Sequence, residues 1–402
     1  MKNTKRLVPA LFLIAAVFSL GADWQQFRGT NGNGVAEAVK LPTDWDESLA
    51  WKAALPGRGP SSPIVVGDRV FVTSSAGVKQ DRLHVLCFNA STGRRIWQRQ
   101  FWATGRTFCH PTSAVAAPTP ASDGERIFAF YSSNDLVCLD LEGNLQWYRG
   151  LARERPRAGN DVGMASSPLV VGDVVVVQVE CQGDPFAMAI DRVTGKTRWT
   201  VKRRPMANWS SPILFRRGDD NLVLLQSPWG ITAHEASTGR ELWSHEASCG
   251  SVASAVVYGS TVYVPVNGIT ALNTESKSKN GVSVAWNENR LQPSGASPTV
   301  HQGKIFAISR AGVLACGELA AKKVAWQVRL KGHHYASPIG VGDKILTVSD
   351  NGNIAVVGLG DEGKVETTHE LGERVITTPA VASDGIYIRS DQHLWKFKSS
   401  DN

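Results

Sequence analysis

The sequence predicts an all-β protein: an eight-bladed β-propeller of four-stranded antiparallel blades, whose ring is closed by an N-terminal strand that completes the last blade. Two observations support this prediction. A short motif of small residues and proline recurs eight times, at intervals of 40 to 57 residues. Each of the intervening segments has the pattern of two consecutive hairpins. Propeller blades repeat at about 40–45 residues, so the spacing and the pattern agree.

The recurring motif has three residues and ends in proline in all repeats but one. In the first repeat it precedes a short apolar strand at 64–66, a Gly67-Asp68 turn and a second apolar strand at 70–72. β-branched residues on both sides of a two-residue glycine turn are typical of a hairpin. The eight copies occupy residues 61–63, 118–120, 166–168, 210–212, 253–255, 296–298, 336–338 and 377–379.

A second hairpin follows, and in the first four repeats it ends in a tryptophan four residues after a turn glycine, as in Gly93 and Trp97, while Trp286 and Trp326 continue the series in weaker repeats. One blade cannot bury both of its faces, so a large flat side chain on the outer strand can dock against the next blade. Such packing contributes about 1–3 kcal/mol per residue. The seventh repeat keeps Gly363 but has no tryptophan. The blade-docking set is Trp51, Trp97, Trp147, Trp199, Trp243, Trp286 and Trp326.

The two ends of the chain are expected to share one sheet. The eighth repeat offers only three strands before the chain ends, whereas residues 49–55 form an isolated strand with Trp51 at the outer-strand position. Adding this strand to the last blade closes the ring and removes the exposed sheet edges of an open stack.

The first 22 residues have the pattern of a secretory signal: three cations, an apolar run and small residues near Gly21 and Ala22. An uncleaved anchor is the alternative. No cysteine follows the run, so we expect no lipid there and a periplasmic or secreted protein. No later stretch is apolar enough to span a bilayer. We therefore expect a signal (1–22), an N-terminal arm (23–48) whose glycine-rich 29–34 is flexible, and a propeller as one domain (49–398).

Charge and cysteine usage exclude several classes of function. The net charge is +7, of which three charges lie in the signal, so the mature chain is too weakly basic to indicate nucleic-acid binding. Cys87, Cys138 and Cys316 share one repeat position that other repeats fill with alanine, which predicts buried free thiols. The pairing of Cys109, Cys181 and Cys249 stays open. No cysteine or histidine spacing predicts a metal site.

The Asp/Asn-x-x-Thr-Gly-x-x-x-Trp repeat resembles the pyrroloquinoline quinone (PQQ)-like propeller repeats over about residues 49–398, and Asp23-Trp24-Gln25-Gln26-Phe27-Arg28-Gly29 resembles an N-terminal motif of exported members. The resemblance implies one of two branches. The quinoprotein dehydrogenases hold PQQ and calcium beside adjacent cysteines, a Glu/Asn pair and a catalytic aspartate. The BamB-type outer-membrane assembly propellers are non-enzymatic scaffolds, usually lipid-anchored.

The chain departs from both branches but is more similar to the BamB type. It has no adjacent cysteines and little room for the insertions that cover a quinone. Asn134-Asp135 and Asn160-Asp161 could supply oxygen ligands, but Asn-Asp pairs are common turn formers. The lipid-bearing cysteine of the BamB branch is missing as well, which argues against a role in outer-membrane assembly. The prediction of a scaffold does not depend on that cysteine.

Loops just ahead of each motif should converge around the axis, where a rigid fold positions functional residues. Arg58 and Arg374 would approach each other on closure and could hold an anion. Trp209 could stack on a planar ligand, and His110 lies in a long insertion that could cover the mouth. Each of these residues could equally be solvated or packed in a loop. The candidate binding face comprises Arg58, His110, Asn160, Asp161, Asn208, Trp209, His333, His334, Tyr335 and Arg374.

The sequence therefore favours a non-catalytic, monomeric, exported scaffold that binds exported or envelope proteins or peptides at its central face. No catalytic constellation and no metal site stand out, and no cofactor is predicted. The alternatives are a redox enzyme that uses PQQ with calcium, in the manner of a quinoprotein dehydrogenase, and a carbohydrate-binding propeller.

Overall fold

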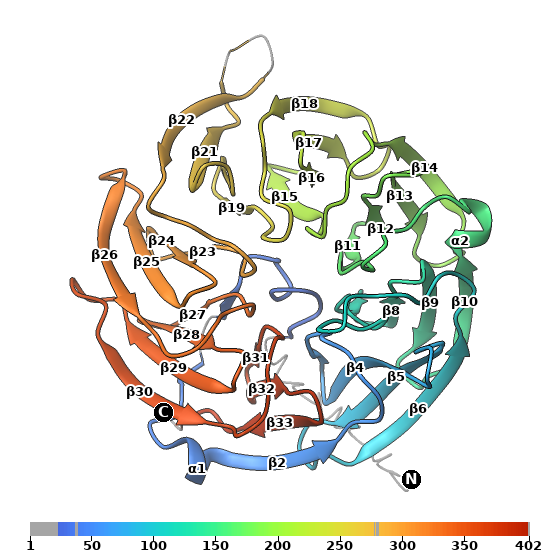
Figure 1. Cartoon of the computed structure of the whole chain (residues 1–402), viewed down its shortest axis with the longest axis horizontal. Helices are drawn as coiled ribbons and strands as arrows, with labels where there is room; N and C mark the ends of the chain where they lie inside the picture. Colours follow the sequence, from blue (N-terminus) through green and yellow to red (C-terminus); the bar gives the residue numbers. More distant parts are fainter. Residues whose placement is uncertain (1–22, 37–38, 277, 279–280, 401–402) are drawn as a thin grey trace, which may run out of the picture.

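The computed structural model describes residues 23–36, 39–276, 278 and 281–400, and it confirms the eight-bladed propeller. Eight antiparallel sheets surround a central axis, and the chain passes from one to the next around the ring (Figure 1). The segment expected to be a signal, 1–22, lies outside the described residues. Within them, two helices of four residues are present, α1 (Trp45–Ser48) and α2 (Leu151–Glu154), and no helix could cross a membrane.

Blades 1 to 4 each consist of four strands that are consecutive in the chain. They are β3 (Ile64–Val66), β4 (Arg69–Ala76), β5 (Arg82–Asn89) and β6 (Arg95–Trp102) in blade 1; β7 (Ala121–Ser122), β8 (Arg126–Phe130), β9 (Asp135–Asp140) and β10 (Leu145–Gly150) in blade 2; β11 (Leu169–Val171), β12 (Val174–Val179), β13 (Phe186–Asp191) and β14 (Thr197–Lys202) in blade 3; and β15 (Ile213–Arg217), β16 (Asp220–Ser227), β17 (Gly230–Glu235) and β18 (Glu241–Glu246) in blade 4.

Blades 5 to 7 follow the same order, and blade 8 takes its outer strand from the N-terminal side of the chain. The strands are β19 (Val256–Tyr258), β20 (Thr261–Val264), β21 (Ile269–Asn273) and β22 (Ser283–Glu288) in blade 5; β23 (Thr299–His301), β24 (Lys304–Ile308), β25 (Val313–Glu318) and β26 (Lys323–Arg329) in blade 6; β27 (Ile339–Val341), β28 (Lys344–Val348), β29 (Asn353–Gly358) and β30 (Val365–Glu370) in blade 7; and β31 (Ala380–Ala382), β32 (Gly385–Arg389), β33 (His393–Phe397) and β2 (Leu49–Ala54) in blade 8.

The outer tryptophans pack on the turn of the next blade. The indole N–H of Trp97 donates to the carbonyl of Leu141 at 2.9 Å. Its ring covers Gly143, where an added Cβ would lie 2.8 Å from the indole. Only glycine fits under the ring, and its φ of +83° also favours glycine. The same hydrogen bond and glycine contact are made by Trp51 to Ala90 and Gly93, Trp147 to Arg192 and Gly195, Trp199 to Ala236 and Gly239, and Trp326 to Gly360 and Gly363.

Three blades depart from this pattern, and one of them, blade 7, has no tryptophan on its outer strand β30. The indole nitrogen of Trp243 has no acceptor among the described residues. Trp286 packs against Tyr263 of its own blade, with ring centroids 6.1 Å apart. Across the strands, the small side chain of Cys87 opposes Trp97 and Cys316 opposes Trp326. Cys87, Cys138 and Cys316 are buried free thiols, as predicted, and Cys109, Cys181 and Cys249 are free as well.

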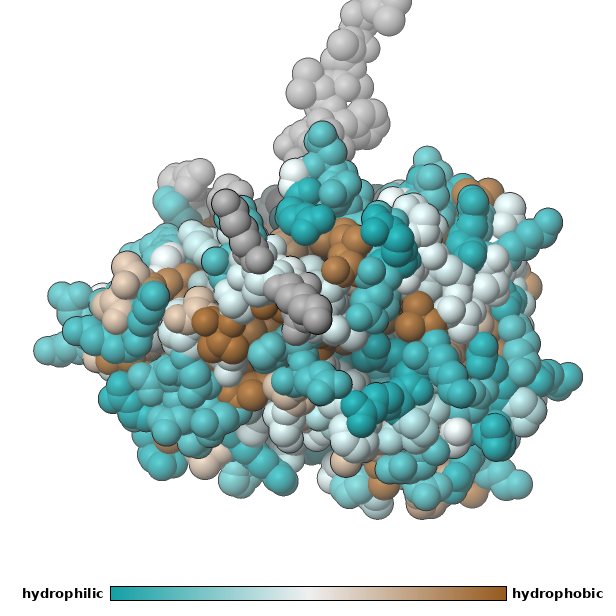
Figure 2. Space-filling model, turned by 90° about the horizontal axis from the view of Figure 1, so that it is seen from above, coloured by the Kyte–Doolittle hydropathy of each residue, from teal (hydrophilic) through white to brown (hydrophobic). Residues whose placement is uncertain are grey.

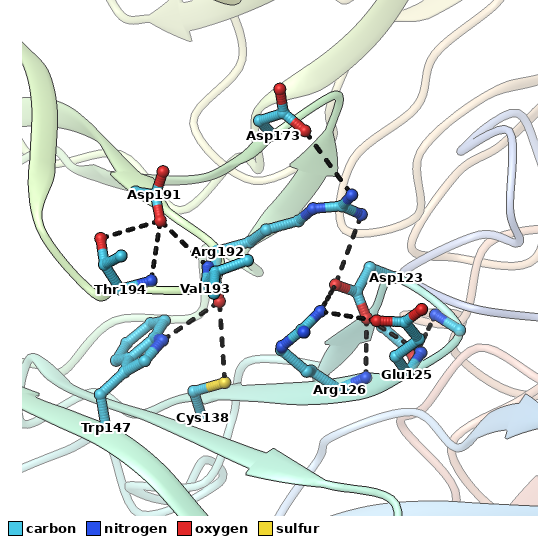
Figure 3. Close-up of polar contacts among 12 residues, drawn as sticks. Asp123, Glu125, Arg126, Cys138, Trp147, Asp173, Asp191, Arg192, Val193 and Thr194 are labelled. Atoms are coloured by element: carbon cyan, nitrogen blue, oxygen red, sulfur yellow. Dashed lines mark hydrogen bonds and ion pairs between the residues drawn. The ribbon is translucent and has the colours of Figure 1, made fainter.

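Charged residues strengthen the boundary between blades 2 and 3 (Figure 3). The carbonyl of Arg192 accepts hydrogen bonds from the indole of Trp147 at 3.1 Å and, more weakly, from the Cys138 thiol at 4.0 Å. Its guanidinium lies between Asp123 (3.4 Å) and Asp173 (3.6 Å). Because the Asp123 side chain is 1% exposed, its charge requires such partners.

The predicted closure of the ring is confirmed. Strand β2 pairs antiparallel with β33, so blue and red segments lie side by side in Figure 1. Trp51 faces Lys396 in this register. The Lys396 ammonium donates to the carbonyl of Ala90 in blade 1 at 3.0 Å and pairs with Asp384 at 2.6 Å. The outer edge of blade 8 is therefore fastened to blade 1.

The expectation that residues 29–34 are flexible is wrong, because the arm is packed across the centre of the ring (Figure 1). Its glycines form tight turns, with φ of +89° at Gly29 and +73° at Gly34. Strand β1 (Val35–Ala36) then adds to blade 7 as a parallel fifth strand beside β27. Hydrogen bonds link the arm to blades 1, 2, 3 and 7 through Trp24–Val65, Gln25–Ser122, Gln26–Val170 and Gly34–Gly340.

The outer surface is mixed in character. Figure 2, in which the ring is seen edge-on, shows hydrophilic side chains over most of the visible surface and hydrophobic ones in small scattered groups. Large apolar side chains are instead buried within and between the blades, for example Phe71, Phe128 and Phe306, each 0% exposed.

Candidate binding site at the axis

A closed ring of hydrogen bonds surrounds the axis. The middle residue of every recurring motif is serine or threonine, and its backbone N–H donates to the hydroxyl oxygen of the corresponding residue in the next blade. All eight bonds are 2.9 or 3.0 Å long. The last joins Thr378 of blade 8 to Ser62 of blade 1. The ring comprises Ser62, Thr119, Ser167, Ser211, Ser254, Ser297, Ser337 and Thr378.

The hydroxyl protons of this ring have no acceptor among the described residues, since each oxygen takes part only as the acceptor of a backbone N–H. The eight residues are buried, with exposures from 1% for Ser337 to 5% for Ser211. All of them line one cavity of about 220 Å³. A buried donor without a partner is costly, so these hydroxyls require water or a ligand in the cavity.

A mostly apolar collar lies on the mouth side of the hydroxyl ring. The inner segments are extended, so alternate residues face the axis, and the residue two places ahead of each hydroxyl also lines the cavity. The inner strands run away from the mouth, which places these residues nearer to solvent than the hydroxyls. The collar comprises Pro60, Ala117, Ala165, Trp209, Val252, Gly295, Tyr335 and Ile376.

The floor of the cavity is provided by Phe27 of the arm. Beyond it, Arg28 is 2% exposed and donates to backbone carbonyls, including those of Pro298 in blade 6 and Ala255 in blade 5. Burial lowers the pKa of Arg28 to about 9, so the guanidinium is still charged at neutral pH. Its hydrogen-bond acceptors among the described residues include no carboxylate. Phe27 therefore closes the cavity on the side of the arm, and the positive charge of Arg28 lies behind it.

Arg374 is the charged residue that the described part of the chain contributes to the cavity wall. Its guanidinium pairs with Asp391 at 3.3 Å, and the Arg374 side chain is 36% exposed. One carboxylate does not use all the donors of a guanidinium. The site thus combines hydroxyl donors, an apolar collar and a cation.

Three of the residues predicted from sequence meet in this wall: Trp209, Tyr335 and Arg374. The Trp209 indole is held by a hydrogen bond to the carbonyl of Gly163 at 2.8 Å. The guanidinium of Arg310 lies 5.5 Å from the Tyr335 ring centroid. The aromatic parts of the collar are therefore fixed before any ligand arrives.

The remaining predicted residues are not part of the wall. Arg58 donates to the carbonyl of Pro111 at 2.5 Å, and the structure does not bring it into the cavity with Arg374. His110 bonds Thr112 at 2.7 Å, and its loop contributes Thr112 and Ser113 to the wall. Asp161 forms an exposed ion pair with Arg106 at 2.7 Å.

Asn160 and Asn208 are buried and donate to the carbonyls of Glu180 and Gly250, which fits a role in holding the loops. His333 is exposed and contacts the carbonyl of Arg310 at 3.2 Å. His334 is 1% exposed, and burial lowers its pKa to about 4, so the ring is neutral. It lines a separate cavity of about 210 Å³ between blades 6 and 7.

Sequence reasoning missed the hydroxyl ring, Phe27 and Arg28. A signal for the ring was present, because the middle residue of all eight motifs carries a hydroxyl. Nothing local to residues 27–28 indicates that they enter the axis, since their partners belong to blades distant in the chain.

The wall does not fit a calcium-bound quinone. Calcium takes six to eight oxygen ligands and prefers carboxylates, whereas the cavity lining has no Asp, Glu, Asn or Gln among the described residues. Asp135 instead accepts hydrogen bonds from Thr104, Ser133 and Tyr148, and Asp161 pairs with Arg106. The described residues contain no cluster of three or more His, Cys, Asp or Glu side chains suited to a metal ion.

Two polyvinylalcohol dehydrogenases are similar to part of this chain. The one from Pseudomonas sp is 27% identical over 174 residues, which cover 39% of this chain and 25% of the relative. The one from Sphingopyxis sp. (strain 113P3) is 28% identical over 186 residues, 42% of this chain and 26% of the relative. The chain thus matches about a quarter of the length of these relatives.

Solved structures share the fold at low sequence identity. Quinohemoprotein alcohol dehydrogenase from Comamonas testosteroni has a TM-score of 0.70 at 12% identity, covering 94% of this chain and 80% of that one. BamB from Moraxella catarrhalis has a TM-score of 0.63 at 15% identity, covering 87% and 99%. A family model described as outer membrane protein assembly factor BamB matches residues 35–183 and 157–290, more than half of the sequence. The chain belongs to this family of PQQ-like β-propellers.

Proposed function

We propose that this protein is an exported, non-catalytic scaffold that binds another protein or peptide with the face around the axial cavity. The observation that carries the proposal is a set of exposed apolar side chains on the loops that build the cavity mouth. They are Phe108 (59% exposed), Val162 (40%), Met206 (40%) and Val252 (43%). Exposed apolar groups gathered around a recess are typical of protein interaction sites.

The loops that carry these side chains are bonded to one another. The N–H of His110 donates to the carbonyl of Val162 at 2.9 Å, which joins the first two loops. Trp209 joins the second, third and fourth loops, because its indole donates to the carbonyl of Gly163 and its backbone N–H donates to the carbonyl of Ser251 at 2.7 Å. A surface that is ordered in advance loses little conformational entropy on binding.

The chemistry of the cavity also favours binding over catalysis. The described wall contains hydroxyls but no histidine or carboxylate beside them that could activate one as a nucleophile. The description of the matched family, an assembly factor, agrees with a scaffold. The pattern of residues 1–22 supports export to the periplasm or beyond, with 23–48 and 49–398 as arm and propeller.

Site-specific photocrosslinking in the native envelope tests the proposal. A benzophenone amino acid at Val252 should yield a protein adduct, identified by mass spectrometry. The matched control is Val193, which is 55% exposed on a turn at the opposite face of the ring. Adducts from neither position, or from both equally, would reject the mouth as the binding face.

The likeness to polyvinylalcohol dehydrogenases favours a second candidate, a quinone-dependent oxidation. Purified protein is mixed with PQQ and calcium, and its absorption spectrum and dye-linked oxidation of polyvinyl alcohol are recorded. Saturable quinone binding with turnover would replace the scaffold proposal. We expect neither, because the wall lacks calcium ligands.

A further inference from the structure

We propose that the axial cavity binds the C-terminal carboxylate of a partner peptide, with an apolar last side chain, through the hydroxyl ring and Arg374. The inference rests on the proposed function, since it assumes a polypeptide partner at the mouth. It names the part of that partner which the cavity recognises.

The hydroxyl ring selects an acceptor. Each ring oxygen already accepts a backbone N–H, so its proton is the part that remains for a ligand. A hydroxyl that accepts one hydrogen bond becomes a better donor of another. A carboxylate accepts about four hydrogen bonds and donates none, whereas an amide would turn its own donors toward the ring.

The charge of the site selects an anion. Arg374 lies in the wall, and the described lining contains no acidic residue. Arg28 adds a second positive charge behind Phe27, where its partners are backbone carbonyls. Guanidinium–carboxylate pairs are among the strongest hydrogen bonds in proteins. Both arginines therefore favour a negative group in the cavity.

The shape of the cavity selects a chain end. Phe27 closes the floor, so a polypeptide cannot pass along the axis and must terminate there. A cavity of about 220 Å³ that is closed at one end can admit the end of an extended chain. Trp209, Tyr335 and Ile376 offer the last side chain an apolar contact.

The collar is continuous with the rim of the mouth, which is formed by the exposed apolar side chains of Phe108, Val162, Met206 and Val252. Val252 lines the cavity and is also 43% exposed, so it belongs to both surfaces. A peptide whose terminus occupies the cavity would lay its preceding residues over this rim. This continuity favours a polypeptide terminus over a free small acid.

The test uses the whole mature protein and a pool of fluorescent hexapeptides that end in Val, Leu, Ile or Phe. The same pool is prepared with a free carboxylate and with a C-terminal amide, and binding is followed by fluorescence anisotropy. The free acids should bind at least about tenfold more tightly, as expected for hydrogen bonds to a charged group. This comparison changes only the ligand, so the folding of a variant does not affect it.

Arg374→Gln should reduce the difference between acid and amide to less than about threefold. The matched control is Arg198→Gln: Arg198 is also an exposed arginine paired with one aspartate, Asp191, but it lies on the outer strand β14, outside the wall. This variant should bind like the wild type. Ser254→Ala, checked by circular dichroism, should weaken acid binding more than amide binding.

Equal binding of acids and amides would overturn the inference, as would a lack of binding by both pools at about 1 mM, the weak end of specific affinities. Crosslinked partners at Val252 would then still support the proposed function, so the two failures are distinguishable. Acid selectivity that survives in Arg374→Gln and Ser254→Ala alike would also overturn the assignment to this cavity.

Discussion

The backbone N–H of Thr378 donates a 3.0 Å hydrogen bond to the hydroxyl oxygen of Ser62, which is 316 residues earlier in the chain. This bond completes the axial ring between blades 8 and 1. The same boundary is held farther out by Arg389, whose guanidinium donates to the carbonyl of Ser61 at 3.1 Å. At the outer edge, Trp51 donates to the carbonyl of Ala90 at 2.9 Å. Three separate hydrogen bonds, from the axis to the outer edge, therefore hold blade 8 against blade 1.

Ser62→Ala should lower the free energy of unfolding by about 1–3 kcal/mol, because the buried N–H of Thr378 loses its acceptor. Urea unfolding followed by circular dichroism measures the change. Ser62→Thr keeps the hydroxyl and should recover most of the loss. Ser91→Ala, at an exposed turn position, is the control and should change stability by less than about 0.5 kcal/mol. A similar loss in both alanine variants would contradict the role of the ring.

Trp51→Ala should destabilise the protein by about 3 kcal/mol, since it removes the ring that covers Gly93 and the bond to Ala90. The matched control is Trp102→Ala: Trp102 is 63% exposed and should be nearly neutral. Both variants are compared by urea unfolding. Equal effects would mean that strand β2 does not depend on its tryptophan.

Arg28→Ala should cost about 3 kcal/mol, because carbonyls of Ala255 and Pro298 lose a buried donor. Arg28→Lys keeps a charge and donors and should recover part of the stability. In the control, Arg216→Ala, the loss is limited to an exposed hydrogen bond to Asn31 at 2.7 Å. Thermal unfolding of the three variants ranks them. If Arg28→Ala lost no more stability than Arg216→Ala, the arm would not stabilise the ring through Arg28.

Burial of His334 predicts a loss of stability in mild acid. Its pKa is about 4 in the folded protein against a usual 6.5, so below pH 6.5 the unfolded chain binds a proton that the folded chain does not. Stability is therefore full above pH 6.5 and falls until about pH 4. The loss between pH 7 and pH 5 is about 2 kcal/mol from this residue.

His334→Gln should remove that part of the pH dependence, measured by urea unfolding at pH 7 and pH 5. His84, His234 and His245 also have lowered pKa values from burial, so the variant should still lose some stability in acid. The groups near His334 are Asp350, whose charge raises its pKa, and His333, whose charge lowers it. Identical pH dependence of wild type and variant would contradict a neutral buried imidazole.

The blades were predictable because their determinants are local and repeated. A turn glycine and a tryptophan such as Gly93 and Trp97 recur in order, and the position of Trp51 in that order identified the closing strand. The arm was not predictable in this way. Gly29 and Gly34 look like a flexible linker, and the partners that order Arg28 exist only after the ring has formed.

The candidate site was predicted in part. Alternation along the inner segments decides which loop residues face the axis: Trp209 and Tyr335 lie two places ahead of a ring hydroxyl, whereas Asn208 and His334 lie three places ahead and point elsewhere. Applying this period of two to each motif would have separated them. Arg58 shows the limit of such reasoning, because its contact with Pro111 depends on a long loop of irregular structure.

The position of the arm has a consequence for the order of assembly. Residues 24–34 are synthesised before any blade, yet their hydrogen bonds reach Val65, Ser122, Val170 and Gly340. Contacts between such distant segments form late, because the chain entropy of long loops opposes them until neighbouring modules are in place. The arm is therefore synthesised before the propeller but is expected to pack among its last segments, and Trp24, which is 2% exposed in the folded protein, becomes buried only at that stage.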